Sequence, residues 1–307
     1  MKIAFLGTST FACPALRALS EQYEIGLVAT QPDRPAGRHA KLHPSPIKEL
    51  ALELGLPLAQ PSRINNPDGL EALRVCAPDA IVVASYGQLL KPAVFDLPPL
   101  GTLNIHASLL PAYRGAAPVN WALIHGESQT GVTTFYIEKG LDTGDVLLSR
   151  AIEIGPDEDA LHLESRLSLL GAELILETLQ GLERGDLEAV VQPEEGVSLA
   201  PTLTREDGHI NWSSSAHAIH NLVRGTVPWP GAWTCLGKRR VKLHKTRVLD
   251  SDAGPIAPGA IGLPEANRLI VGTQDRLLEV LEIQREGKPR VCGTDFLHGL
   301  HLPARFS

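Results

Sequence analysis

Short apolar runs alternate with amphipathic segments through the first third of the chain, and this alternation limits the possible folds more than any other feature. Lys2–Leu6, Glu24–Thr30 and Ala80–Ser85 have the length and composition of buried strands. Segments with a helical pattern lie between them, at Cys13–Glu21, Ser45–Leu54 and Pro67–Val75. Strands that alternate with helices predict an α/β fold, with a mostly parallel sheet, right-handed crossovers and helices on both faces.

The turn after the first strand, Gly7-Thr-Ser-Thr10, bears on what such a sheet binds. A dinucleotide-binding turn carries a Gly-x-Gly-x-x-Gly fingerprint, and this turn does not. The Rossmann-like opening of the chain therefore does not predict a dinucleotide site. The turn either presents backbone N–H groups to a substrate or caps the following helix, and both interpretations stay open.

The second half of the chain changes character. A long amphipathic helix is expected at Asp159–Leu179, with Gly181 as its stop signal. Beyond residue 205, short apolar runs between Gly and Pro predict a small antiparallel β-barrel, preceded by a helix near Ser215–Val223. The runs expected as strands are Gly231–Cys235, Val241–Val248, Ala260–Leu263, Leu269–Val271 and Leu277–Ile283. The expected organisation is a catalytic α/β domain at 1–181, a Pro- and Gly-containing linker at 182–204 and a barrel domain at 205–307.

The bulk composition agrees with two domains. A chain of 307 residues, 43% of them hydrophobic, can bury a large core. No run of about 20 apolar residues occurs and the chain begins directly with a strand, so we expect a cytoplasmic protein without a membrane span. Nothing in the sequence indicates a dimer, and a monomer is expected. The isolated cysteines Cys13, Cys76, Cys235 and Cys292 argue against a zinc site or a disulfide framework.

The net charge of −7 is unevenly placed along the chain. Residues 205–307 carry 14 Lys and Arg against 10 Asp and Glu, a net charge of +4, so the preceding residues carry −11. This asymmetry predicts that the C-terminal third faces an anionic partner. The alternative is a solvated basic surface that has no partner.

Asn104, His106 and Asp142 are the candidate catalytic residues. Leu103–Ala107 is expected to be a short strand, in which Asn104 and His106 point to the same face and can converge on one substrate atom. An amide, an imidazole and a carboxylate are the groups needed to pass an acyl carbon between two nitrogens without a covalent enzyme intermediate or a metal. The alternative is that Asn104 caps a turn, His106 is a core histidine and Asp142 forms an Asx turn.

The sequence around these residues resembles the folate-dependent formyltransferase family. The shared pattern is the Asn-x-His pair, a Ser-Leu-Leu-Pro turn at 108–111 and an Asp-x-Gly loop within Gly140–Asp145. Gln31–Arg38 is similar to the insertion loop of the members that act on methionyl-tRNA, and Pro228–Gly231 is similar to their C-terminal domain. The resemblance covers essentially the whole chain and implies an OB-like barrel in the C-terminal part.

The resemblance also implies the reaction. 10-Formyltetrahydrofolate would be the co-substrate, and its formyl group would pass to the α-amino group of methionine on initiator tRNA. Asn104 and His106 would stabilise the oxyanion, while Asp142 would orient His106 and accept the proton of the amine. No nucleophilic side chain is required, and Ser108 has no Gly-x-Ser-x-Gly elbow that would make it an acyl carrier.

The folate is expected beside the segment that follows the strand Ala80–Ser85, the turn at 108–111 and the loop around Asp142. The residues expected there are Tyr86, Gly87, Gln88, Leu89, Leu90, Ser108, Leu109, Leu110, Pro111, Leu141, Thr143 and Gly144. For Leu89 and Leu90, ordinary core packing is an equal alternative. Many relatives carry a basic residue where this chain has Ala112, to which no role is assigned.

Two basic groups are expected to contact tRNA. Arg34, Arg38 and Lys41 lie in a loop interrupted by Pro and Gly, and Lys238, Arg239, Arg240, Lys242 and Lys245 surround an expected hairpin. Both groups would be available to backbone phosphates. The alternative for each group is a solvated surface.

Three other functions share some of these features. A sugar-nucleotide amine formyltransferase and the hydrolase module of formyltetrahydrofolate dehydrogenase would use the same three catalytic residues. The loop Gln31–Arg38 and the basic C-terminal third argue against both. A catalytically inactive nucleic-acid-binding module would be expected to have lost one of the three residues, and this chain has all of them.

Overall fold

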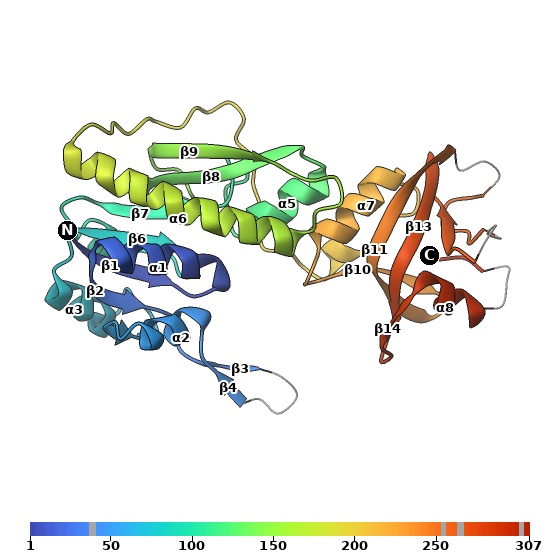
Figure 1. Cartoon of the computed structure of the whole chain (residues 1–307), viewed down its shortest axis with the longest axis horizontal. Helices are drawn as coiled ribbons and strands as arrows, with labels where there is room; N and C mark the ends of the chain where they lie inside the picture. Colours follow the sequence, from blue (N-terminus) through green and yellow to red (C-terminus); the bar gives the residue numbers. More distant parts are fainter. Residues whose placement is uncertain (37–40, 253–255, 263–266, 301–303) are drawn as a thin grey trace. The chain divides into compact units, whose positions relative to one another are not determined.

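The structure, a computed structural model, describes residues 1–36, 41–252, 256–262, 267–300 and 304–307 (Figure 1). The chain divides into two compact units. The N-terminal unit contains residues 1–115, 130–152 and 164–199, and the C-terminal unit contains residues 116–129, 153–163 and 200–307. The segment expected as a linker, 182–204, is therefore divided: residues up to 199 belong to the N-terminal unit, and residues from 200 belong to the C-terminal unit. The domain bounds expected at 181 and 204 stay a prediction.

A seven-stranded sheet forms the N-terminal unit. In spatial order its strands are β5 (Leu58–Ala59), β2 (Glu24–Ala29), β1 (Lys2–Gly7), β6 (Ala80–Ala84), β7 (Thr102–His106), β8 (Gln129–Tyr136) and β9 (Val146–Glu153). The first five strands pair in parallel, and β8 runs antiparallel to β7. The mostly parallel sheet is confirmed. The antiparallel strand β8 was not predicted from the sequence.

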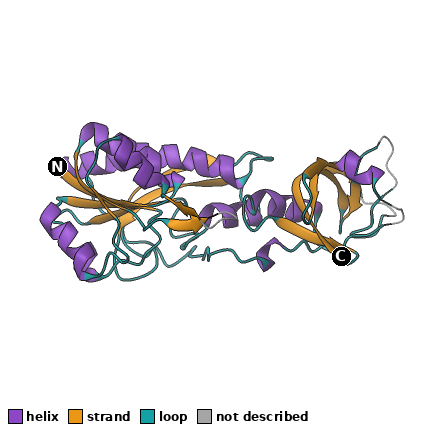
Figure 2. Ribbon diagram, turned by 90° about the horizontal axis from the view of Figure 1, so that it is seen from below, coloured by secondary structure: helices purple, strands orange, loops and turns teal. Residues whose placement is uncertain are grey.

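Helices cover both faces of this sheet, as predicted (Figure 2). The helices of the unit are η1 (Thr10–Ala12), α1 (Cys13–Gln22), α2 (Pro46–Glu53), α3 (Pro67–Cys76), α4 (Pro92–Phe95) and α6 (Ala160–Arg184). Ala4 and Leu6 of β1 pack with Leu73 of α3 on one face. On the other face α6 approaches β7 so closely that a Cβ on its Gly171 would lie 2.7 Å from Ile105. The alternation of side chains along each strand divides the core between the two faces.

The end of α6 differs from the prediction. The helix does not stop at Gly181 but continues to Arg184, and Gly185 follows in the left-handed region with φ +70°. A glycine inside a helix costs only about 1 kcal/mol relative to alanine. Here Gly181 also makes room for Leu187, whose Cβ would lie 3.0 Å from a Cβ at that position. A small residue therefore suits this position, and the helix runs through it to Arg184.

The segment after β2 was expected to be an irregular loop and is a short hairpin instead. β3 (Arg34–Ala36) pairs antiparallel with β4 (Lys41–His43), with Arg34 opposite His43 and Ala36 opposite Lys41. Proline at the second position of β3 is compatible with a two-stranded ribbon because the outer edge of such a ribbon needs no N–H donor. The prolines and glycine of this segment led the sequence-based prediction away from a strand.

The C-terminal unit contains a curled antiparallel sheet and several helices (Figure 2). Its strands are β10 (Ala232–Leu236), β11 (Arg239–Asp252), β13 (Arg276–Arg285), β12 (Ile270–Gly272) and β14 (Arg290–Cys292), and its helices are α5 (Pro118–His125), η2 (Glu206–Gly208), α7 (Ala216–Gly225) and α8 (Gly293–His298). β11 pairs with both β10 and β13, as a β-barrel domain requires. Ala260–Leu263 was wrongly expected as a strand, since Ala260 and Ile261 form only isolated bridges and Leu263 lies outside the described residues.

Candidate active site

Asn104 and His106 lie on the same face of β7, as the spacing predicted. β7 pairs in parallel with β6, where Asn104 is opposite Val83, and antiparallel with β8, where His106 is opposite Thr133. Ile105 between them faces α6, so the two polar side chains point to the opposite side of the sheet. The Asn104 side chain is half-buried, and no hydrogen bond to it is found among the described residues. Its amide is therefore free to bind a substrate.

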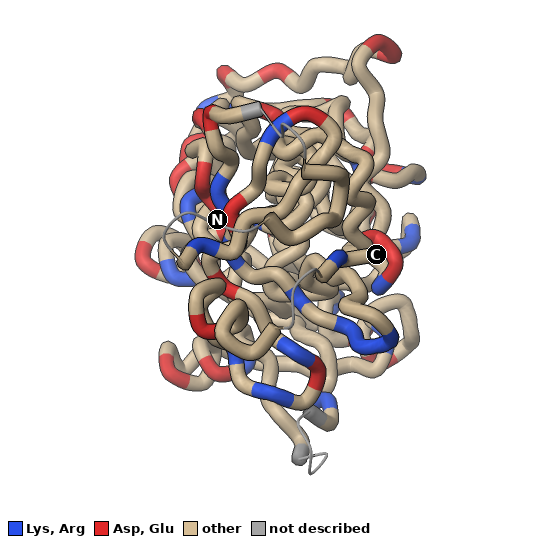
Figure 3. Tube along the Cα trace, turned by 90° about the vertical axis from the view of Figure 1, so that its right-hand side faces the viewer, with Lys and Arg blue, Asp and Glu red and all other residues tan. Residues whose placement is uncertain are grey.

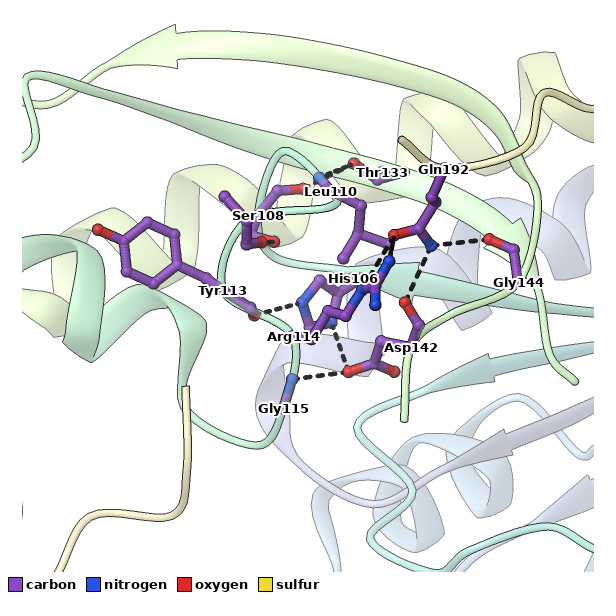
Figure 4. A network of polar contacts seen from close by, with 11 residues as sticks. His106, Ser108, Leu110, Tyr113, Arg114, Gly115, Thr133, Asp142, Gly144 and Gln192 are labelled. Carbon is purple, nitrogen blue, oxygen red and sulfur yellow. Dashed lines mark hydrogen bonds and ion pairs between the residues drawn. The ribbon is translucent and has the colours of Figure 1, made fainter. Parts of the chain in front are cut away.

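The two ring nitrogens of His106 have different partners (Figure 4). Nε2 lies 2.9 Å from the backbone carbonyl of Tyr113, and Nδ1 lies 3.8 Å from Oδ2 of Asp142. A carbonyl can only accept, so Nε2 carries the proton of that hydrogen bond. The ring is buried and meets the edge of Phe135 at a ring-centroid distance of 6.2 Å. These contacts hold the ring, with Nδ1 facing the Asp142 carboxylate.

Asp142 reaches His106 from the loop between β8 and β9. Its backbone has φ +53°, a left-handed conformation that is costly for a residue with a side chain. Its Oδ2 accepts the backbone N–H of Gly115 at 2.8 Å. A Cβ on Gly144 would lie 1.8 Å from the carbonyl oxygen of Tyr136, so only glycine fits there. The tight loop expected from Asp142-Thr-Gly144 exists and directs the carboxylate to the histidine.

Two residues of this site, Gln192 and Arg114, were not predicted from the sequence. Gln192 donates to the backbone carbonyls of Asp142 and Gly144 at 2.9 and 2.7 Å, and its Oε1 accepts from the guanidinium of Arg114. Arg114 lies in the segment that resembles the family, although no role was assigned to it. Gln192 lies in the segment interpreted as a linker, where no periodicity marks it.

Among the residues expected to bind folate, Tyr86 lies in the core. Its ring is 2% exposed and packs with Leu6, Leu27 and Ile64. Its backbone carbonyl accepts from the side chains of Thr8 and Gln31 at 2.9 and 2.7 Å. Burial raises the pKa of the Tyr86 hydroxyl to about 12. The ring therefore supports the sheet, and the expected folate contact of Tyr86 stays a prediction.

The other expected folate residues fall into two groups. Gln88 and Ser108 are engaged by the protein itself: Gln88 bonds the backbone of Ile64 and Ser62, and the buried hydroxyl of Ser108 donates to the carbonyl of Ala112 at 2.6 Å. The second group consists of residues that are exposed or partly exposed. Leu89 is 79% exposed, Leu141 and Gly87 are exposed, Leu90 is partly buried against the core, and Leu109, Leu110, Pro111 and Thr143 are half-buried.

The first basic group expected to contact tRNA is only partly described. Arg34 is exposed on β3, where its guanidinium donates to the side chain of Gln31. The backbone of Lys41 belongs to β4. Arg38 lies outside the described residues. Asp33 beside them is held by Lys48 at 2.7 Å, and this hydrogen bond keeps the pKa of the carboxyl below its usual value.

The second basic group surrounds the β10–β11 hairpin, as predicted. Val241 and Leu243 are buried, Lys238, Arg239 and Lys245 are exposed, and Arg240 and Lys242 line a pocket of about 360 Å³. The other residues around the pocket are Arg205, Trp229, Pro230, Trp233, Gln284, Arg285, Glu286 and Gly287. Arg240 stacks on Trp233, with Cζ 4.2 Å from the ring centroid, and Lys242 donates to the carbonyl of Pro230 at 2.7 Å. Figure 3 marks the basic residues along the trace in blue.

The four cations around this pocket face one acidic residue, Glu286, so the pocket suits an anion. Trp229 also lines the pocket and is 55% exposed, so an aromatic surface lies next to the cations. Trp212, in contrast, is a core residue that stacks on Phe306.

In the described part of the chain, no three His, Cys, Asp or Glu side chains gather as a metal ion would require. No helix among the described residues is long and apolar enough to cross a membrane.

Comparison with known proteins identifies the family. Residues 1–179 match the formyl transferase family, and residues 202–301 match the formyl transferase C-terminal domain. Methionyl-tRNA formyltransferases of Solibacter usitatus and Geobacter metallireducens are 46% and 48% identical to the chain; each match covers 98% of this chain and 96% of the relative.

Solved structures share the fold. The sugar 3N-formyl transferase WlaRD has a TM-score of 0.68 at 17% identity and covers 94% of this chain and 99% of its own. Methionyl-tRNA formyltransferase from Clostridium thermocellum has a TM-score of 0.55 at 16% identity, with 81% and 94% covered. At these identities the likeness shows the fold alone, while the sequence matches show the family. The chain therefore belongs to the formyltransferase family.

Proposed function

We propose that the chain transfers the formyl group of 10-formyltetrahydrofolate to the α-amino group of methionine on initiator tRNA, the step that prepares this tRNA for translation initiation. One observation carries the proposal. The free Asn104 amide and the His106 ring lie on the same face of β7, and the Asp142 carboxylate lies 3.8 Å from Nδ1 of His106. The full-length likeness to methionyl-tRNA formyltransferases supports this acceptor.

The three side chains would have different tasks. When bound, the folate supplies the formyl carbon, and attack by the amine develops negative charge on the formyl oxygen. The Asn104 amide would donate to that oxygen, a contribution of about 3–4 kcal/mol for one well-placed donor. The exposed side chains of Leu89 and Leu141 provide apolar contacts of the kind that an aromatic folate ring requires.

His106 would act through Nδ1, because Nε2 is committed to the carbonyl of Tyr113. In its charged form, Nδ1–H can donate to developing negative charge and then pass a proton to the departing nitrogen. Asp142 lies 3.8 Å from Nδ1 and would accept the proton of the attacking amine. The amine has a reference pKa near ~8, so a large fraction must lose a proton before attack at neutral pH.

The proposed tRNA contacts lie at Arg34, Arg38 and Lys41 and around the β10–β11 hairpin. The pocket lined by Arg240 and Lys242 supports a phosphate contact, since four of its lining residues are cationic and one is acidic. Stacking of Arg240 on Trp233 holds the guanidinium plane in a fixed direction, which favours an oriented contact with an anion. Because the proposed partner is tRNA, we place the protein in the cytoplasm, and we expect it to act as a monomer.

A direct assay separates this function from the alternative of a sugar-nucleotide amine acceptor. The purified protein is given 10-formyltetrahydrofolate with either methionyl initiator tRNA or a dTDP-amino sugar, and formylated product is measured. Formylation of the tRNA at a kcat/KM at least about 100-fold above that of the sugar supports the proposal. Preferred formylation of the sugar, or no reaction with the tRNA, would overturn it.

A further inference from the structure

Gln192 is a buried polar residue in a segment that is otherwise exposed. Its side chain is 8% exposed, whereas the neighbouring Val191 is 74% exposed. The Gln192 amide donates to two backbone carbonyls and accepts twice from Arg114, at 3.1 Å from Nε and 2.7 Å from Nη2. These four bonds use both N–H groups and both lone pairs of the amide. The cost of burying this polar group is thus fully compensated.

Both carbonyls that Gln192 binds belong to the loop that carries Asp142. They are those of Asp142 itself and of Gly144, two residues later (Figure 4). A non-glycine residue at φ +53° costs about 1–2 kcal/mol and persists only where its surroundings hold it. A single amide that bonds both carbonyls opposes relaxation of this turn. The direction of the Asp142 side chain depends on that turn.

Gln192 also contacts Arg114, which lies in the turn that binds the Asp142 carboxylate. Arg114 directly precedes Gly115, whose N–H donates to Oδ2 of Asp142 at 2.8 Å. The segment that contains Gln192 also holds the backbone of this turn through Ser198. The Ser198 hydroxyl accepts the N–H of Tyr113, and its carbonyl accepts the N–H of Arg114. Gln192 therefore connects the loop that carries the carboxylate with the turn that binds it.

We propose that Gln192, held by Arg114, is a positioning residue that keeps the Asp142 carboxylate aligned with Nδ1 of His106. This inference rests on the proposed catalytic function of Asp142. The hydrogen bonds of Gln192 among the described residues go to Arg114, Asp142 and Gly144, so we expect its effect on the reaction to pass through Asp142. A displacement of about 1 Å at a catalytic group lowers turnover by as much as about 100-fold.

A double-mutant cycle with full-length protein tests the inference. Gln192→Glu is nearly isosteric and keeps an acceptor for Arg114 but has no N–H to donate to the two carbonyls. We expect Gln192→Glu and Gln192→Leu to lower kcat about 10–100-fold while KM for methionyl-tRNA changes less than about 3-fold. In the background of Asp142→Asn, the same changes at Gln192 should lower kcat less than about 2-fold further. Val191→Ala is the matched control, and thermal unfolding reports whether each variant folds.

The outcomes separate the inference from the function on which it rests. Equal losses from the Gln192 changes with and without the Asp142 carboxylate would show a merely structural contact and overturn the positioning role. Unchanged kcat in a folded Gln192→Glu variant would overturn it as well. A normal kcat in Asp142→Asn would instead overturn the catalytic proposal for Asp142.

Discussion

Oδ2 of Asp142 lies 3.8 Å from Nδ1 of His106 and accepts the N–H of Gly115 at 2.8 Å. A carboxylate oxygen held by a backbone donor on one side and facing an imidazole on the other is fixed in place before any substrate arrives. The 3.8 Å separation is longer than a hydrogen bond, so the interaction with His106 is electrostatic. Catalytic hydrogen bonds often tighten only when substrate binds, which is the behaviour expected here.

Replacing either member of this pair is expected to reduce turnover strongly. His106→Ala and Asp142→Asn should each lower kcat for methionyl-tRNA by about 10²–10⁴-fold, because electrostatic stabilisation and proton transfer are lost. Single-turnover kinetics with saturating substrates measures this. Glu195→Gln, an exposed acid of the same unit, serves as the control and should keep full activity. Near-normal rates in both site variants would contradict the assignment.

A methyl group at position 144 is expected to disturb the Asp142 loop. Gly144→Ala would bring a Cβ to within 1.8 Å of the Tyr136 carbonyl, so the backbone must shift. We expect a loss of stability of about 1–3 kcal/mol, measured by urea unfolding, and a reduced kcat. At Gly155 the atoms nearest to the corresponding Cβ all belong to Glu158, the closest being its Cβ at 3.3 Å, which makes Gly155→Ala the control. Equal stability of the two variants would refute the predicted clash.

The cations of the C-terminal pocket are expected to contribute to tRNA affinity. Arg240→Ala and Lys242→Ala should each weaken binding and reduce the slope of log Kd against log salt by about 1 in magnitude, if each cation contacts a phosphate. Filter binding over a series of salt concentrations measures the slope. Arg276→Ala, which removes a cation paired with Asp250 at 3.2 Å, should change it less. A slope that stays the same in both pocket variants argues against a phosphate in this pocket.

Tyr86→Phe is expected to leave stability unchanged or to raise it by about 1 kcal/mol. The hydroxyl of Tyr86 is buried and has no hydrogen-bond partner among the described residues, so its removal relieves an uncompensated desolvation cost. Thermal or urea unfolding at neutral pH measures the change. A loss of more than about 1 kcal/mol would indicate that the hydroxyl has a favourable contact.

The same residue makes stability depend on pH in the alkaline range. The pKa of Tyr86 is about 12 in the folded protein and near 10 when unfolded, so between these values the unfolded state binds fewer protons. Stability must then fall as pH rises above about 10, by about 3 kcal/mol at most from this group. The variant should lose less stability than the parent between pH 9 and pH 11. Parallel curves for the two proteins would contradict the assignment of this decline to Tyr86.

Local sequence patterns predicted most of the N-terminal architecture. The strands at Lys2–Gly7 and Ala80–Ala84 and the helix at Pro67–Cys76 lie within a residue or two of their expected bounds. Prediction failed where a local signal competed with packing. Gly181 predicts a helix end, but α6 continues to Arg184 and Leu187 packs closely against this glycine.

The sequence by itself determined that Asn104 and His106 share a strand face, because the direction of side chains along a strand is a local property with a period of two. Only the tertiary structure decided which groups meet them. Gly115 is 27 residues from Asp142, and Gln192 is 50 residues from Asp142 and 78 from Arg114. Contacts across such separations depend on how loops return over the end of the sheet. That path follows from the packing of the whole unit, and no local pattern in the chain encodes it.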